Sequence, residues 1–246
     1  LFPYTTLFRS IVRIVPTLKV NNRKLNERFY IETLGMKPLL EESAFLSLGD
    51  QTATERLILE EAPSMRTRRV EGLKKLARLL IKVENPSEIE GLLSQMKPLP
   101  RLFKGNRGYA FEIVSPEEDV ILVHAENDVR DLVPLETVPE FYSNTSIKYV
   151  SQFEVSMELR LPEGTESLLD PEGVAQVITF TKGQGPDLAV ENNVTWDLTM
   201  LKFLVKNFDL TSLRQKFEKT GYFVPKSEKF FLGKDTNNIE LWFEEA

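Results

Sequence analysis

Three basic side chains stand at alternating positions of stretches that are typical of strands, and their spacing suggests anion binding. Because successive side chains of a strand point to opposite faces, parity places Lys19, Arg78 and Lys82 opposite the apolar face. A guanidinium group beside ammonium groups suits a carboxylate, with Arg78 as the fork-shaped partner. We therefore predict that these residues, together with Glu60, bind a small anionic molecule. The alternative is a solvated sheet face on which Glu60 neutralises Arg78.

Acidic residues dominate a second candidate site in the C-terminal half. Its expected ligand-binding residues are Glu154, Glu158, Lys202 and Trp242, and Glu240 lies on the same face as Trp242. The three carboxylates could hold a hard cation such as Ca²⁺ or Mg²⁺, which prefers oxygen ligands. They could instead raise one another's pKa and provide a general base, with Glu240 as the candidate catalytic residue. The alternative is that Arg160 and Lys202 pair with the carboxylates on a wet surface.

The chain has one histidine, His124, and no cysteine, which excludes several kinds of catalytic centre. Thiol nucleophiles and thiolate zinc sites need cysteine, and an HExxH zinc protease needs two histidines on one helical face. No GxSxG elbow or DTG motif is present, whereas a serine–lysine pair stays open. We expect a structural role for His124, which ends a strand near Glu126, with a catalytic role as the alternative.

Composition and charge favour a globular protein that acts away from nucleic acids and membranes. The net charge is −6, whereas a general nucleic-acid binder needs a basic surface. No window approaches the roughly 18 apolar residues of a membrane span. The opening LFPYTTLFRS lacks an initiator methionine and a signal-peptide pattern, and we expect residues 1–10 to be a non-native leader that is only loosely attached. The expected location is cytoplasmic, with secretion or surface association as the alternative because the native N-terminus is then missing.

The elements that must position these side chains repeat along the chain, because a strand, a helix and further strands recur in each half. A helix is expected after Asn22, with Leu25, Phe29 and Tyr30 as its inner face. Further helices are expected after Asn85 and Asp209. Strands are expected near 12–20, 37–40, 45–48, 56–61, 76–83, 101–103, 109–114, 120–125, 153–161, 174–181, 187–191, 200–205, 230–232 and 238–243. The pattern predicts an α+β fold made of four βαβββ units, the last two shorter.

These units pair into two predicted domains. The N-terminal domain is expected at 11–127 and the C-terminal domain at 150–246. Residues 128–149 carry prolines and acids without a clear period, and we interpret them as the linker.

Local motifs resemble the vicinal oxygen chelate superfamily, which includes glyoxalase and extradiol dioxygenases. LKVNNRKLNERFYIETLGM (Leu18–Met36) is similar to the superfamily's opening pattern, and SPEEDVILV (Ser115–Val123) and KDTNNIELWFE (Lys234–Glu244) are similar to its closing pattern. The whole chain, with the tract NNVTWDLTMLKFLVKNFDL, further resembles the streptococcal CppA family. The resemblance implies two glyoxalase-like domains of paired βαβββ units. The family also carries the label of a proteinase that degrades a complement component, which implies a host complement protein as partner.

The same resemblance implies that the usual metal site is lost in the first domain. The superfamily's His and Glu ligand positions fall there on Val15, Arg78 and Leu122, and only Glu60 or its neighbour Glu61 remains. Valine and leucine offer no lone pair, and an arginine repels a cation. No metal or other cofactor is therefore expected in that domain. In the second domain the closing Glu is retained as Glu240, so a divalent cation stays open.

Three functions follow from these observations. The first is a glyoxalase-like protein that binds a small anionic ligand without the usual metal. The second is the complement-degrading proteinase of the family label. The third is a protein-interaction module without catalysis. The sequence leaves open whether the protein is an enzyme.

Overall fold

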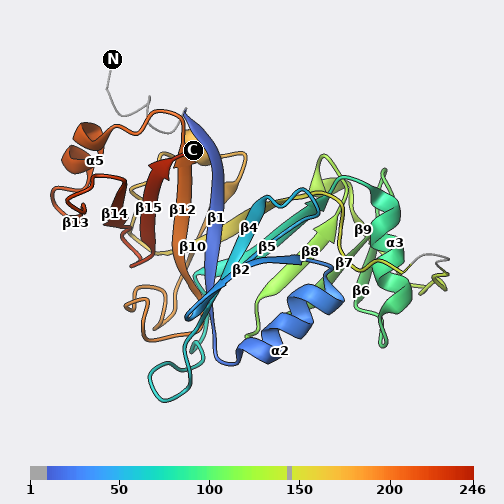
Figure 1. Ribbon diagram of the computed structural model, residues 1–246. Helices are drawn as coiled ribbons and strands as arrows, with labels where there is room; N and C mark the ends of the chain where they lie inside the picture. The colour runs from blue at the N-terminus through green and yellow to red at the C-terminus, as the bar shows by residue number, and fades with distance from the viewer. Residues whose placement is uncertain (1–9, 143–145) are drawn as a thin grey trace. The chain divides into compact units, whose positions relative to one another are not determined.

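The computed structural model describes residues 10–142 and 146–246, which form mixed β-sheets with few helices (Figure 1). The chain divides into two compact units. Unit 1 contains Leu1–Asn21, Ala62–Ala77 and Met157–Ala246, and unit 2 contains Asn22–Glu61 and Arg78–Ser156. Each unit therefore combines segments that lie far apart in the sequence. The sequential division into 11–127, 128–149 and 150–246 stays a prediction.

Unit 1 is built around a five-stranded ladder. Its elements are β1 (Ile11–Val20), the second half of β10 (Phe153–Pro162), α4 (Pro171–Val174), β11 (Ile178–Gly183), β12 (Leu198–Val205), α5 (Leu210–Lys216), β13 (Tyr222–Phe223), β14 (Phe230–Lys234) and β15 (Glu240–Glu245). The ladder runs β13-β14-β15-β12-β1. In it β12 is parallel to β15 and antiparallel to β1. A separate parallel pair joins β10 to β11.

The helix α5 covers an aromatic core of unit 1. Asp209 caps its start by accepting hydrogen bonds from the backbone N–H groups of Thr211 and Ser212. Phe217, at its end, is fully buried, and its ring centroid lies 5.3 Å from that of Phe231. A Cβ atom on Gly233 would lie 2.6 Å from the Phe217 ring, so this close approach requires glycine.

Unit 2 contains two ladders and the longest helix. Its elements are α2 (Arg23–Glu27), η1 (Arg28–Thr33), β2 (Lys37–Glu42), β3 (Phe45–Gly49), β4 (Glu55–Glu61), β5 (Leu76–Val83), α3 (Pro86–Gln95), β6 (Arg101–Lys104), β7 (Tyr109–Val114), β8 (Val120–His124), η2 (Val129–Asp131) and β9 (Val133–Pro134). The first ladder runs β4-β3-β2 and the second β5-β8-β7-β6-β9. Helix α3 packs against β7 and β8.

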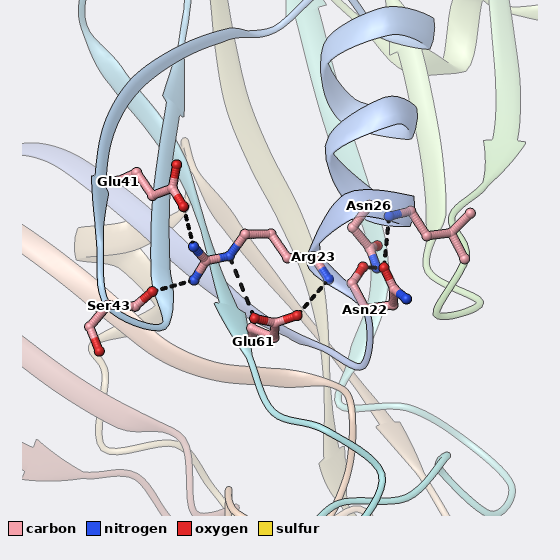
Figure 2. A network of polar contacts seen from close by, with 7 residues as sticks. Asn22, Arg23, Asn26, Glu41, Ser43 and Glu61 are labelled. Carbon is pink, nitrogen blue, oxygen red and sulfur yellow. Dashed lines mark hydrogen bonds and ion pairs between the residues drawn. The ribbon is translucent and has the colours of Figure 1, made fainter.

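A polar network fixes the start of α2 in unit 2. Asn22 caps the helix by accepting a hydrogen bond from the backbone N–H of Leu25. Figure 2 shows the Arg23 guanidinium group between Glu41 and Ser43 on one side and Glu61 on the other. The Arg23 backbone N–H also donates to the Glu61 carboxylate at 3.0 Å. The helix start is thereby tied to β2, to the following turn and to β4.

The inner face expected for this helix is wrong at Leu25, whose exposed fraction is 53%. The helix widens into a π-helical segment over Arg28–Thr33, in which the Leu34 N–H donates to the Phe29 carbonyl, five residues earlier. This spacing shifts the buried stripe away from Leu25, and Asn26 and Tyr30 become the fully buried residues.

The remaining elements agree with the expected pattern in the first two repeats and differ from it later. The α+β glyoxalase-like class is confirmed, as are the helix starts at Asn85 and Asp209. The strand expected at 187–191 is wrong. This stretch forms turns, and its polar groups bind side chains, because Asp187 accepts both terminal nitrogens of the Arg68 guanidinium. The predicted linker contains η2 and β9.

The expected N-terminal leader falls mostly outside the described residues, because residues 1–9 are not among them. Ser10 is buried, and its carbonyl accepts a hydrogen bond from the Lys206 N–H. This last residue of the predicted leader is therefore attached to unit 1.

Candidate functional site

The register of unit 2 gathers polar side chains on one face of the sheet. In the parallel pair β5–β8, Lys82 lies opposite His124 and Leu80 opposite Leu122. In the antiparallel pair β7–β8, Glu112 lies opposite Leu122. Because paired positions share a face, Lys82, His124 and Glu112 point to the same side as Arg78. We call the surface formed by Arg78, Lys82, Glu112, Leu122 and His124 the basic face.

The opposite face of the same strands is part of the core, which explains why the polar residues alternate. Leu79, Phe111 and Ile121 are fully buried on that side. Helix α3, which packs on β7 and β8, contributes the buried residues Ile89 and Leu92. Strand parity therefore places the polar residues of the basic face on the side of the sheet away from this core.

The basic face carries more positive than negative charge. The Arg78 guanidinium lies 3.8 Å from the Glu112 carboxylate, and Arg101 on β6 lies 3.3 Å from the same carboxylate. The Lys82 ammonium donates a hydrogen bond to the Asn127 side-chain oxygen at 3.0 Å. The Lys82 and Arg78 charges both lower the pKa of the neighbouring His124, so the local field is positive and favours an anion.

His124 lies within this charged set and is only 4% exposed. Burial of the imidazole, together with the nearby charges of Lys82 and Arg78, lowers the pKa of His124 from 6.5 to about 4. The ring is therefore neutral at pH 7. Its Nδ1 atom is buried and has no hydrogen-bond partner in the described part of the chain.

The other residues predicted for the first site lie elsewhere or contact other groups. Lys19 is on β1 in unit 1 and is 7% exposed. Glu60 is on β4, opposite Phe45, in the other ladder of unit 2. Sequence reasoning missed Glu112, whose carboxylate lies 3.8 Å from the Arg78 guanidinium. The alternation of residues 109–114 contained the signal, because it places Glu112 on the outward parity.

The second predicted site is partly assembled on the five-stranded ladder of unit 1. Lys202 lies opposite Trp242, and Met200 opposite Glu240, so these four residues share one face. The Lys202 ammonium lies 3.1 Å from the Glu244 carboxylate, to which the Trp242 indole N–H donates at 2.8 Å. Glu244 is a second acid that sequence reasoning missed, although it is two residues beyond Trp242 on the same parity.

The three carboxylates expected to hold a hard cation are not brought together. Glu158 lies opposite Thr179 on the separate β10–β11 pair, and Glu154 belongs to the part of β10 in unit 2. Among residues 10–142 and 146–246, no group of three or more His, Asp or Glu could hold a metal ion. The hypothesis of a Ca²⁺ or Mg²⁺ site at Glu154, Glu158 and Glu240 therefore has no geometric support.

Lys75 is a further titratable group that the sequence did not single out. It is 1% exposed in unit 1, and its ammonium donates to the Val190 carbonyl at 2.7 Å. Burial lowers the pKa of Lys75 from 10.5 to about 8. No serine contributes to this lowering, so the lysine gives no support to a serine–lysine catalytic pair.

The fold defines the class of protein. Glyoxalase I from Zea mays is 9% identical and superposes with a TM-score of 0.54 over 95% of this chain and 92% of its own. A Bacillus subtilis protein with a provisional assignment as a dioxygenase is 11% identical and reaches 0.57 over 96% and 86%. The chain therefore has the glyoxalase-like, vicinal oxygen chelate fold.

The family follows from closer matches. The model of the CppA N-terminal domain matches residues 13–135, and that of the CppA C-terminal domain matches residues 150–243. The crystal structure of the cppA protein from Streptococcus pneumoniae TIGR4 is 65% identical, with a TM-score of 0.95 over 96% of this chain and 100% of that one. The chain belongs to the CppA family.

Two further observations concern curated relatives and membrane-spanning helices. Among curated proteins, none matches the chain in sequence. No helix in the described part of the chain is long and apolar enough to cross a membrane.

Proposed function

We propose that this CppA-family protein binds a small anionic ligand on the basic face of unit 2. The observation that carries the proposal is the pairing of Lys82 with a buried, neutral His124 on adjacent strands, beside Arg78. A neutral imidazole adds no charge of its own but sits in a positive field, which Lys82 and Arg78 create. Such a field attracts an anion, which Lys82 and Arg78 can bind through charge-assisted hydrogen bonds.

We further propose that the ligand binds without the metal ion implied by the fold. At two superfamily ligand positions unit 2 carries Leu122 and Arg78. Leu122 is 2% exposed and has no donor atom, and the Arg78 guanidinium lies beside Glu112. This donor set does not fit a transition metal, which needs lone pairs from imidazole or carboxylate groups.

Calorimetric titration with sodium acetate, the simplest carboxylate, tests the proposal. The wild-type protein should bind acetate, and Lys82→Met should weaken binding about tenfold, because a charge-assisted contact is lost. Lys24→Met is the matched control, since Lys24 is an exposed lysine of the same unit and the charge change is equal. Equal binding by all three proteins would place the anion elsewhere, and metal analysis of chelator-free protein checks the absence of zinc or nickel.

The proteinase of the family label and a non-catalytic interaction module remain alternative proposals. Incubation of the purified protein with a host complement protein decides between them, because only a proteinase yields fragments. If cleavage occurs and survives both Glu240→Gln and His124→Ala, neither residue is its catalytic group. A cytoplasmic location, with secretion as the alternative, likewise stays a prediction.

A further inference from the structure

We infer that the outer edge of β11 in unit 1 binds an extended, basic peptide segment of another protein, which adds a strand to the sheet and places an apolar side chain in a cavity beside β11. The inference goes beyond the anion site of unit 2 and is independent of it. Three features of unit 1 support it: an edge without protection, a cavity on one face of that edge, and an unpaired acid on the adjoining helix.

Among the described residues, β11 is the one strand at the end of a sheet that lacks protection against further pairing. The strands β9 and β13 also end sheets, but each is two residues long. The strand β2 ends a sheet too, and it carries Pro38, Glu41, Glu42 and an irregular register. By contrast, β11 has six residues, a regular register, no proline and one charged residue, Lys182. Short length, proline, charges and bulges are what normally keep an edge from pairing, so β11 is open to another strand.

The backbone of β11 presents hydrogen-bonding groups on the side away from β10. The Met157 N–H donates to the Val177 carbonyl at 2.8 Å, and the Glu163 N–H donates to the Gly183 carbonyl at 3.1 Å. Because backbone groups alternate in direction along a strand, the odd-numbered residues of 177–183 bond to β10. The residues whose N–H and C=O groups point outward are therefore Ile178, Phe180 and Lys182. In the described part of the chain these groups have no neighbouring strand.

A cavity of about 280 Å³ lies on the face of β11 that carries the side chains of these outward residues. Leu161, which lies opposite Lys182 in the β10–β11 pair, lines the same cavity. Pro171 of α4 and the following Ala175 line it as well. An apolar cavity of about 150 Å³ already holds a benzene ring, so an aliphatic side chain fits here. Because alternate side chains of an added strand lie on this face, main-chain pairing and the cavity select the same peptide.

The charge beside the cavity favours a basic peptide over a second copy of this chain. The Lys182 ammonium lies 2.9 Å from the Glu166 carboxylate, so this pair is neutral. Asp170, which caps α4, interacts with the charge of Lys216. The exposed Glu172 on α4 forms no ion pair with the rest of the described chain, and it leaves a negative charge there. A second copy would add another Glu172 at this edge, whereas a lysine or arginine of a peptide complements the first.

Fluorescence anisotropy with a labelled heptapeptide tests the inference. The peptide alternates threonine with leucine and has a lysine at each end, so its leucines and lysines share one face when it is extended. Replacing both leucines by alanine should weaken binding to the wild-type protein about tenfold. Replacing both lysines by glutamate should also weaken binding. Glu172→Gln should reduce this preference for lysine about twofold, as an exposed charge predicts, whereas Glu245→Gln, at an exposed acid of the same unit, should not.

A pair of variants at Lys182 separates the backbone from the side chain. Lys182→Pro and Lys182→Ala both remove the ammonium group, but only proline removes the outward N–H, which takes no part in the pairing with β10. Proline should weaken peptide binding about fivefold relative to alanine, as the loss of one backbone hydrogen bond predicts. Hydrogen exchange measured by NMR decides the question even if Lys182→Pro fails to fold. The peptide should slow exchange of the Phe180 amide and leave that of Thr179, which faces β10, unchanged.

The outcomes separate the possible occupants of the edge. A wild-type protein that ignores the peptide, or binds it without slowing exchange at Phe180, would overturn the inference. Equal affinities for the lysine and glutamate peptides would rule out the basic class of partner. A dimer in sedimentation that Lys182→Pro abolishes would assign the edge to a second copy of the chain instead of a peptide. None of these results bears on acetate binding at the basic face.

Discussion

Replacing the buried Lys75 by methionine should change how the stability of the protein depends on pH. Three acids, Asp197, Glu191 and Asp187, favour the charged form of Lys75, and the positive charge of Lys234 opposes it. Burial nevertheless outweighs them and lowers the pKa of Lys75 to about 8. The folded protein therefore binds this proton less tightly than the unfolded chain does.

The size of the effect follows from the two pKa values. The ordinary value is 10.5 and the folded value about 8, a difference that corresponds to about 3 kcal/mol. Below pH 8 Lys75 is charged in both states, and the full cost of burying the charge is present. Between pH 8 and 10.5 the folded state releases the proton first, so the free energy of unfolding rises. Above pH 10.5 the cost is absent.

Urea unfolding of wild type and Lys75→Met at several pH values from 7 to 10.5 measures this effect. The difference between their free energies of unfolding should shift in favour of wild type by up to about 3 kcal/mol over that range. Other lysines and tyrosines titrate in both proteins, so their contributions cancel in the difference between the two free energies of unfolding. Lys226→Met, at an exposed lysine of unit 1, should show no such trend. A difference that stays constant from pH 7 to 10.5 would refute the reasoning.

Three further predictions concern packing, the histidine and the acidic face. Gly233→Ala should lower the free energy of unfolding by about 1–3 kcal/mol, because the new Cβ would lie 2.6 Å from the Phe217 ring, and thermal unfolding against wild type measures this. His124 should titrate near pH 4 by NMR rather than near 6.5. Because the pKa of His124 is depressed in the folded state, the free energy of unfolding should fall as the pH drops from 6.5 toward 4. An NMR titration midpoint above pH 6 would contradict the buried, neutral ring. Glu240→Gln and wild type should give equal, flat calorimetric traces with Ca²⁺ and Mg²⁺, since Glu240 shares its face with Glu244 and not with two further acids. Cation binding that this substitution weakens would instead support the hard-cation hypothesis.

Local chemistry made parts of the fold predictable from sequence. The helix starts at Asn22, Asn85 and Asp209 were recognised because a capping side chain acts on backbone N–H groups within three residues. Strand parity was equally reliable. It placed Lys202 and Trp242 on one face, and they lie opposite each other in the β12–β15 pair.

Pairing between distant strands was not predictable in the same way. Parity assigns a side chain to a face of its own strand, but it does not say which strand becomes the neighbour. Glu158 and Glu240 were grouped because both are outward on their strands, yet they lie on separate ladders. Lys75 was overlooked for a related reason. A lysine near a strand start is usually solvated, whereas this one is buried and its ammonium donates to the Val190 carbonyl in a distant turn.

His124 shows how strand register determines which charged groups surround a residue. From sequence alone, a single histidine at the end of a strand, near the acidic residue Glu126, favours a structural role. The parallel pairing of β5 with β8 adds that the ring lies opposite Lys82, and the β7–β8 pairing adds Glu112 to the same face. The Nδ1 atom of this buried imidazole has no hydrogen-bond partner among the described residues, which costs stability. The register of the strands, and not the residue type alone, therefore puts His124 in the positive field of Lys82 and Arg78.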